Sequence, residues 1–231
     1  VTESWDGTNW TEVNDVNTAR RSGGGAGTQT AALYFGGGPG SDTETETWNG
    51  TNWTEVADLN TGRNEASGSG ETNTAALYFG GAPDVAHTEL WNGTSWSEQN
   101  NLSTGRNFLT GIGTTSNSIA AGGESPTPAR NTTEEWTGAG AAVGAWATGN
   151  AVNTARAYAG ASGATAALAI SGQQPGLPTF LTAVEEWTGP GAPIGAWSTG
   201  GNLNTARQNL AGAGIQTAAL AFGGYRDVPP D

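Results

Sequence analysis

The feature that most constrains this chain is a repeat marked by tryptophan. All ten Trp residues fall into five pairs, and the first members recur at intervals of 43, 43, 45 and 51 residues. The first members are Trp5, Trp48, Trp91, Trp136 and Trp187, and their partners are Trp10, Trp53, Trp96, Trp146 and Trp197. A period of this length indicates a repeat architecture, in which each copy is one small unit that needs its neighbours to bury a core.

Other residues keep the same register. Each copy has a Glu two residues before its first Trp: Glu3, Glu46, Glu89, Glu134 and Glu185. Each also has one Arg after the Trp pair: Arg20, Arg63, Arg106, Arg156 and Arg207. A Gly-rich stretch follows, then an apolar segment that ends in two small residues, as in Leu33-Tyr34-Phe35-Gly36-Gly37. The markers therefore define one unit that is copied five times.

Each unit contains four short extended segments separated by turn signals. In the second full unit they are expected from about Arg63, over Ala75–Phe79, up to Trp91 and from Trp96. Asn49-Gly50 predicts a tight hairpin, and the corresponding hairpins of the last two units are longer. Four strands in 40 to 50 residues is typical of a propeller blade. The predicted fold is an all-β, five-bladed β-propeller with four antiparallel strands per blade.

The two ends of the chain are predicted to share one blade. Residues 2–13 supply a third and fourth strand, and residues 207–224 supply a first and second strand. We expect a single domain over 1–231, with blades at 20–57, 63–99, 106–149, 156–200, and 207–224 joined to 1–13. Closure would remove exposed strand edges. The alternative is a larger ring with further repeats outside this chain, which does not begin with Met.

Composition excludes several classes of partner and site. The chain has 21 carboxylates, eight Arg and no Lys, so its net charge of −13 repels phosphate backbones and argues against nucleic-acid binding. No apolar run approaches the ~20 residues of a spanning helix, so membrane insertion is not expected. Because there is no Cys, disulfides and thiolate metal sites are excluded.

The repeat resembles the kelch family, which includes the galactose-oxidase-like propellers. The shared features are two Gly after an apolar strand, a Trp beyond the next strand, and an Arg at the start of the strand that follows. The sequence Asn204-Thr205-Ala206-Arg207, followed by residues 216–224, is similar to kelch-type repeats encoded by marine bacteriophages. That resemblance implies a virion or tail-associated protein with a virion or extracellular location. It implies other virion proteins, or a host-surface glycan or protein, as partners, and possible homo-oligomers within an assembly.

The repeated Arg and Trp residues have two interpretations each. The Arg side chains could form a ring of ligand-binding cations, but one Glu per unit in matching register favours a structural ion pair in every blade. Exposed Trp faces bind sugars and cations, but positions at both ends of a hairpin favour packing between blades. We predict the structural role for both sets.

The loops between the second and third strands vary in length and content, and loops on a rigid scaffold often carry binding residues. The candidate ligand-binding residues there are Asp84, His87, Arg130, Gln173, Phe180 and Tyr225. Plain solvated loops are the alternative. The acidic loops could hold calcium, but no run matches an EF-hand, so neither a metal nor a cofactor is predicted.

Catalysis receives little support from the sequence. His87 is the sole His and Cys is absent, which argues against Ser-His-Asp and Cys-His arrangements and against galactose-oxidase chemistry. A glycosidase with paired carboxylates stays formally open. The predicted function is a non-enzymatic structural or recognition module, foremost a phage tail, fibre or capsid-surface component. The alternative is a glycan-binding, lectin-like propeller.

Overall fold

The computed structural model describes residues 1–40, 42–126, 128–138, 144–162, 166–174, 180–188, 196–215 and 218–225. Within these ranges the chain is all-β and has no helix. The strands form four antiparallel sheets of four strands and two antiparallel sheets of two strands. The antiparallel all-β class expected from the sequence is therefore present.

The four-stranded sheets follow the sequence repeat. The first contains β3 (Gly24–Thr28), β4 (Ala31–Phe35), β5 (Thr45–Trp48) and β6 (Trp53–Val56). The second contains β7 (Ser67–Thr72), β8 (Ala75–Phe79), β9 (Thr88–Trp91) and β10 (Trp96–Glu98). The third contains β11 (Thr110–Gly113), β12 (Asn117–Ala121), β13 (Thr133–Thr137) and β14 (Ala145–Gly149). The fourth contains β15 (Gly160–Ser162), β16 (Ala166–Ile170), β17 (Val184–Thr188) and β18 (Ala196–Thr199).

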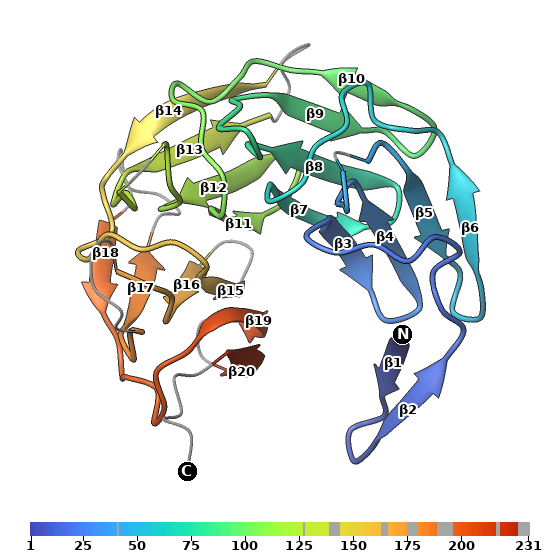
Figure 1. Cartoon of the computed structure of the whole chain (residues 1–231). Helices are drawn as coiled ribbons and strands as arrows, with labels where there is room; N and C mark the ends of the chain where they lie inside the picture. Colours follow the sequence, from blue (N-terminus) through green and yellow to red (C-terminus); the bar gives the residue numbers. More distant parts are fainter. Residues whose placement is uncertain are drawn as a thin grey trace.

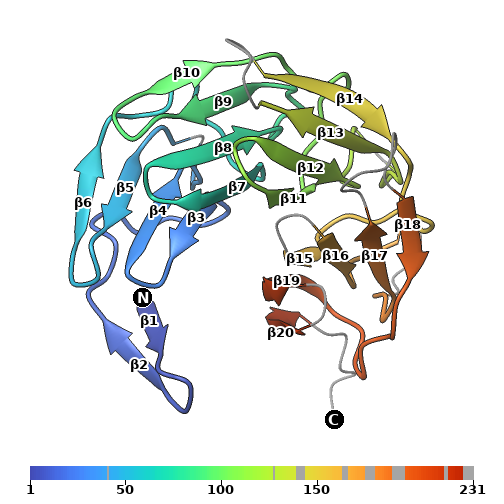
Figure 2. The same cartoon turned by 180° about the vertical axis from the view of Figure 1, so that it is seen from behind.

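The sheets are arranged along an open arc, with the first strand of each sheet innermost and the fourth outermost (Figure 1). One end of the arc is the hairpin of β1 (Thr2–Trp5) and β2 (Trp10–Val13), and the other is the hairpin of β19 (Gln208–Ile215) and β20 (Ala218–Tyr225). The view from behind shows the same gap between them (Figure 2). These hairpins form separate sheets, so the shared fifth blade stays a prediction.

The inner strands are rich in glycine, which lets neighbouring sheets approach closely at the centre of the arc. A Cβ added to Gly68 of β7 would lie 2.8 Å from the Phe35 ring and 3.0 Å from the carbonyl oxygen of Gly25. A Cβ added to Gly111 of β11 would lie 2.5 Å from the Phe79 ring. Side chains at these positions would push adjacent sheets apart.

The expected start of the first strand was wrong by four residues. In the second sheet the strand begins at Ser67 rather than near Arg63. Glu65 has a φ of +57°, and a left-handed residue interrupts an extended strand. Glu65 therefore belongs to a loop, and its backbone bonds to Ser22 and Phe108 of the neighbouring repeats.

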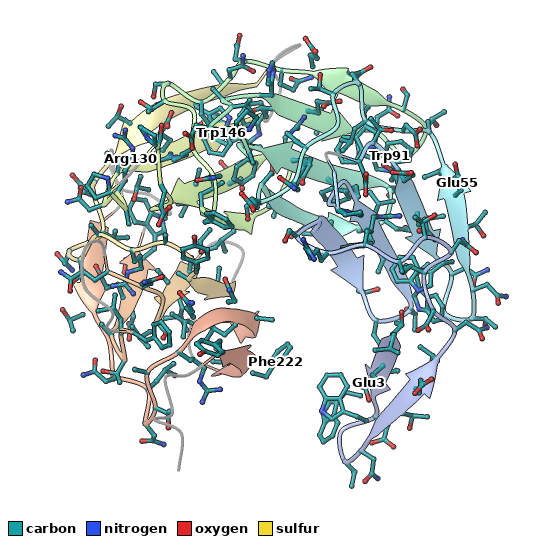
Figure 3. All side chains as sticks on the ribbon, in the orientation of Figure 1. Glu3, Glu55, Trp91, Arg130, Trp146 and Phe222 are labelled. Atoms are coloured by element: carbon teal, nitrogen blue, oxygen red, sulfur yellow. The ribbon has the colours of Figure 1, made fainter. Side chains whose placement is uncertain are left out.

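The core lies between adjacent sheets. The second strands of the first two complete sheets end in a Phe that packs edge-on against the second Trp of the next sheet. Phe35 and Trp96 lie 4.9 Å apart between ring centroids, and Phe79 and Trp146 lie 4.8 Å apart. Figure 3 shows Trp91 and Trp146 among the side chains between the sheets. Burying one large apolar side chain contributes roughly 1.5–3 kcal/mol, so these contacts hold the arc together.

Candidate functional site

Each four-stranded sheet contains one buried Arg–Glu ion pair. The pairs are Arg20–Glu46 at 2.8 Å, Arg63–Glu89 at 2.6 Å, Arg106–Glu134 at 2.8 Å, and Arg156–Glu185. All eight side chains are at most 5% exposed. Burial lowers the pKa of Arg106 from its ordinary value and Glu134 opposes that shift. These cations are bound inside the sheets and are not presented to a ligand.

A second set of residues completes each pair, and sequence reasoning missed it. The other carboxylate oxygen of Glu46 accepts from the backbone and side-chain nitrogens of Asn17 at 2.7 and 2.8 Å. Asn60 makes the same two bonds to Glu89, both 2.8 Å long. Asn17 and Asn60 stand three residues before the repeat Arg, within a recurring Asn-Thr-x-Arg motif. This motif is the sequence signal for the second set, because its Asn offers the Glu both a backbone and a side-chain N–H donor.

The fifth ion pair is not formed. Arg207 donates to the carbonyl oxygen of Gly223 at 3.1 Å, and Glu3 on β1 is exposed. Neither forms an ion pair with any residue that the structure describes. The two members therefore lie at opposite ends of the arc, each without the partner that its counterparts have.

The two Trp of a pair have different roles. The first donates within its own sheet, as Trp48 Nε1 does to the carbonyl oxygen of Gln29 at 2.9 Å. The second bonds across sheets: Trp96 Nε1 donates to Thr45 Oγ1 at 3.0 Å, and Trp146 Nε1 donates to Thr88 Oγ1 at 2.9 Å. These Trp side chains have the packing role that was predicted for them, and neighbouring sheets cover their ring faces.

Trp53 is an exception at the open end. Its Nε1 is buried and has no hydrogen-bond partner among the described residues. By register, Thr2 on β1 corresponds to Thr45, because both stand one residue before the repeat Glu. Trp5 and Trp10 of the terminal hairpin are 39% and 54% exposed, whereas Trp91 and Trp96 are 2% and 5% exposed. The first hairpin therefore lacks cover that the complete sheets receive.

A ladder of backbone hydrogen bonds links the four complete sheets and the C-terminal hairpin near the start of their first strands. Its members are the residues two positions after each repeat Arg: Ser22, Glu65, Phe108, Tyr158 and Asn209. Each backbone N–H donates to the preceding member's carbonyl oxygen, at 3.0, 2.8, 3.1 and 2.9 Å in chain order. We call these five residues the inter-sheet ladder. It follows the arc from the first complete sheet to the C-terminal hairpin.

Every ladder residue has a positive φ, between +50° and +57°, although none is glycine. A left-handed conformation costs a non-glycine residue roughly 1–2 kcal/mol. The backbone is therefore the same in all five copies while the side chains differ completely. Non-glycine residues that are held in such a strained conformation are candidates for functional residues.

Two ladder side chains form an aromatic pair. The rings of Phe108 and Tyr158 lie 4.1 Å apart between centroids, with an angle of 30° between their planes, and both residues are half-buried. Burial raises the pKa of the Tyr158 hydroxyl, and the charges of Glu124 and Glu65 raise it further. The aromatic pair thus lies in a negative field.

Glu124 and Glu65, the two carboxylates that act on Tyr158, belong to a wider acidic group. The pKa of Glu124 is raised by burial first, then by the charges of Asp84 and Glu65. Glu65 accepts a 3.3 Å hydrogen bond from Asn107 Nδ2, and Asn107 pairs with Glu124 through the backbone. Glu65, Asp84 and Glu124 form no ion pair with any described residue.

The structure brings together some of the loop candidates predicted from sequence. The rings of Phe180 and Tyr225 lie 5.7 Å apart in an edge-on arrangement, and Tyr225 is 60% exposed. Gln173 pairs through the backbone with both Ala157 and Phe180. The charge of Asp84 acts on Glu124, which in turn acts on Tyr158.

Two other candidates lie apart. Arg130 donates to the carbonyl oxygen of Ser125 at 2.6 Å within its own loop, and His87 is half-buried. Neither makes a hydrogen bond or ion pair through its side chain to another candidate in the described part of the chain. The longer hairpin loops predicted after Trp136 and Trp187 lie largely at 139–143 and 189–195, outside the described residues.

Searches for a metal site and for known relatives add no further assignment. No group of three or more potential metal ligands gathers among the described residues. The same residues contain no helix long and apolar enough to cross a membrane. No protein-family model matches the chain, and neither does any curated protein.

Proposed function

We propose that the chain closes into a five-bladed, kelch-like propeller and acts as a non-enzymatic recognition module. The observation that carries the proposal is the inter-sheet ladder, in which one rigid backbone holds five different side chains. A scaffold that repeats its backbone and varies its displayed residues suits binding rather than a single reaction. The module binds through the end of the sheets where the ladder and the variable loops lie.

Closure is supported by the unsatisfied groups at both ends of the arc. Phe222 corresponds to Phe35 and Phe79, which cover the second Trp of the next sheet; its counterpart would be Trp53. A cavity of about 980 Å³ lies beside Trp53 and is lined also by Thr2, Glu3 and Gly212. Figure 3 shows Phe222 pointing into the gap toward the N-terminal hairpin. Docking β20 beside β1 would cover Trp53 and pair Arg207 with Glu3.

The register of the closed blade follows from the complete sheets. Leu33 lies opposite Thr47 in the first sheet, so Leu220 is expected opposite Ser4. Because the chain has no Cys, the double variant Ser4→Cys/Leu220→Cys reports this pairing cleanly. We expect a disulfide to form under mild oxidation and to shift gel mobility. The matched control, Thr11→Cys/Leu220→Cys, moves one thiol to the neighbouring strand and should stay reduced. Equal cross-linking of both, or of neither, would refute closure in this register.

The virion assignment rests on the resemblance to phage-encoded kelch repeats. An antibody against the chain should detect it in purified particles, at a fixed ratio to the capsid protein. Recovery only in the soluble fraction of infected cells, with none in particles, would contradict the assignment.

Glycan binding is the second candidate, because Phe180 and Tyr225 meet on the loop end of the sheets and Tyr225 is largely exposed. Aromatic faces with neighbouring amides suit sugar rings. A glycan array probed with the full chain and with Tyr225→Ala tests this candidate. Loss of a specific signal in the variant would support it, and the absence of any signal would exclude it for the glycans tested.

A further inference from the structure

The aromatic pair Phe108–Tyr158 lies near carboxylates, because the charges of Glu124 and Glu65 act on the Tyr158 hydroxyl. The Trp pairs lie within and between sheets and include residues as little as 2% exposed, whereas Phe108 and Tyr158 are both half-buried. Their carbonyl and N–H groups belong to the inter-sheet ladder, which fixes the relative position of the two rings. The rings therefore form a preorganised apolar surface at one end of the sheets.

The charge around this surface is mostly negative, although the guanidinium of Arg130 lies near Glu124 and donates to the carbonyl oxygen of Ser125. Glu65 is itself a ladder residue and neighbours Phe108 through the 2.8 Å backbone bond. Glu124 and Asp84 come from the adjacent loops and act electrostatically on each other. Elsewhere in the four complete sheets the buried carboxylates are paired with Arg, but these three have no such partner among the described residues.

An aromatic face beside unpaired carboxylates is complementary to a cation with an apolar surface. Ring faces attract ammonium groups, and the attraction grows when water is displaced. The carboxylates supply the opposite charge at partly desolvated positions, where Coulomb attraction is stronger than in bulk water. A neutral sugar would leave this charge uncompensated, and an anion would be repelled.

We propose that the Phe108–Tyr158 pair, flanked by Glu65 and Glu124, binds a small alkylammonium ligand. The ligand's methyl groups pack on the rings and its positive charge faces the carboxylates. This proposal rests on the recognition function proposed above and names the ligand class for one part of the same surface. It is independent of the Phe180–Tyr225 pair.

The test compares two ligands of the same shape. Choline is titrated into the ¹⁵N-labelled full chain, and 3,3-dimethyl-1-butanol, in which carbon replaces the charged nitrogen, is the neutral control. We expect choline to shift the amides of Phe108 and Tyr158 saturably and the neutral compound to bind at least several-fold more weakly. Equal binding of both, no binding of either, or shifts confined to Phe180 and Tyr225 would overturn the proposal.

Variants separate the contributions of the rings and the charge. Tyr158→Leu should weaken choline binding about 2- to 30-fold, the range of cation–π energies. Glu124→Gln should weaken choline several-fold and leave the neutral compound unchanged. Tyr225→Leu is the matched aromatic control and should bind choline like the parent chain. Chemical shifts of residues in β7 and β8 report whether each variant is folded.

Failure of this proposal can be told apart from failure of the recognition function. If choline does not bind but the chain is found in particles and captures another ligand, only the ligand class is wrong. If the Cys cross-link also fails to form, closure of the ring in the proposed register is wrong as well.

Discussion

Trp10 of β2 and Phe222 of β20 lie 6.2 Å apart between ring centroids, although more than two hundred residues separate them in sequence. Their strands stand at opposite ends of the arc and share no backbone pairing. Both side chains are largely exposed, at 54% and 39%. The two ends of the chain thus approach each other through aromatic side chains. Substitutions in the two terminal hairpins can therefore test whether the ring closes.

The first prediction concerns Arg207 and Glu3. In the complete sheets, removing one partner of the ion pair leaves a buried charge, so Arg63→Ala should lower the free energy of unfolding by about 3–5 kcal/mol. If the chain closes, a double-mutant cycle with Arg207→Ala and Glu3→Ala should give a coupling of at least ~1 kcal/mol in urea unfolding. A coupling near zero would indicate that the ends stay apart.

The second prediction uses the Thr that accepts from a Trp of the next sheet. Thr45→Val removes the acceptor of Trp96 Nε1 and should cost about 1–3 kcal/mol, because a buried N–H is left without a partner. Thr2→Val should have a similar cost only if Trp53 Nε1 turns to Thr2 on closure. Thermal or urea unfolding of both variants measures the difference. A neutral Thr2→Val beside a destabilising Thr45→Val would argue for an open arc.

The third prediction concerns backbone strain in the inter-sheet ladder. Ser22 has a φ of +57°, so Ser22→Gly should relieve strain and stabilise the chain by up to about 1 kcal/mol, after the entropy of Gly in the unfolded state is subtracted. Ser97→Gly in β10, a regular strand, is the control and should destabilise by roughly 0.5–1 kcal/mol. Opposite signs of the two effects in urea unfolding are expected. Equal destabilisation would mean that Ser22 is not strained.

The fourth prediction is a pH effect at Glu135 on β13. Burial raises the pKa of this carboxyl in the folded chain, so folding disfavours its ionised form. The resulting penalty is present at neutral pH and disappears as the pH falls below the pKa of the unfolded state. Glu135→Gln should therefore stabilise the chain at pH 7 by less than about 1 kcal/mol, since the group is only partly buried and water screens its charge.

The control for this effect is Glu55→Gln, an exposed carboxylate on β6. Unfolding free energies of both variants and the parent are compared between pH 3 and pH 7. A gain for Glu135→Gln that persists unchanged at the lowest pH would rule out ionisation as its cause.

Sequence by itself determined the elements that depend on local pattern. The Trp spacing, the Asn-Gly turn and the apolar segments gave the strands of the second sheet, including Ala75–Phe79, because alternation and turn chemistry act over a few residues. The register of Arg and Glu also gave the partners that the four complete sheets bring together, since the repeat puts both at fixed positions.

What only the tertiary structure decided concerns contacts between sheets. No pattern near Glu65 signals a positive φ there, because that conformation is imposed by the hydrogen bond to the sheet before it. The meeting of Phe108 with Tyr158, fifty residues apart, depends on the angle between two sheets, and so does the carboxylate group around them. Local pattern defines each sheet. The packing of one sheet on the next decides which side chains share a surface, because that packing is set by the size of residues on both.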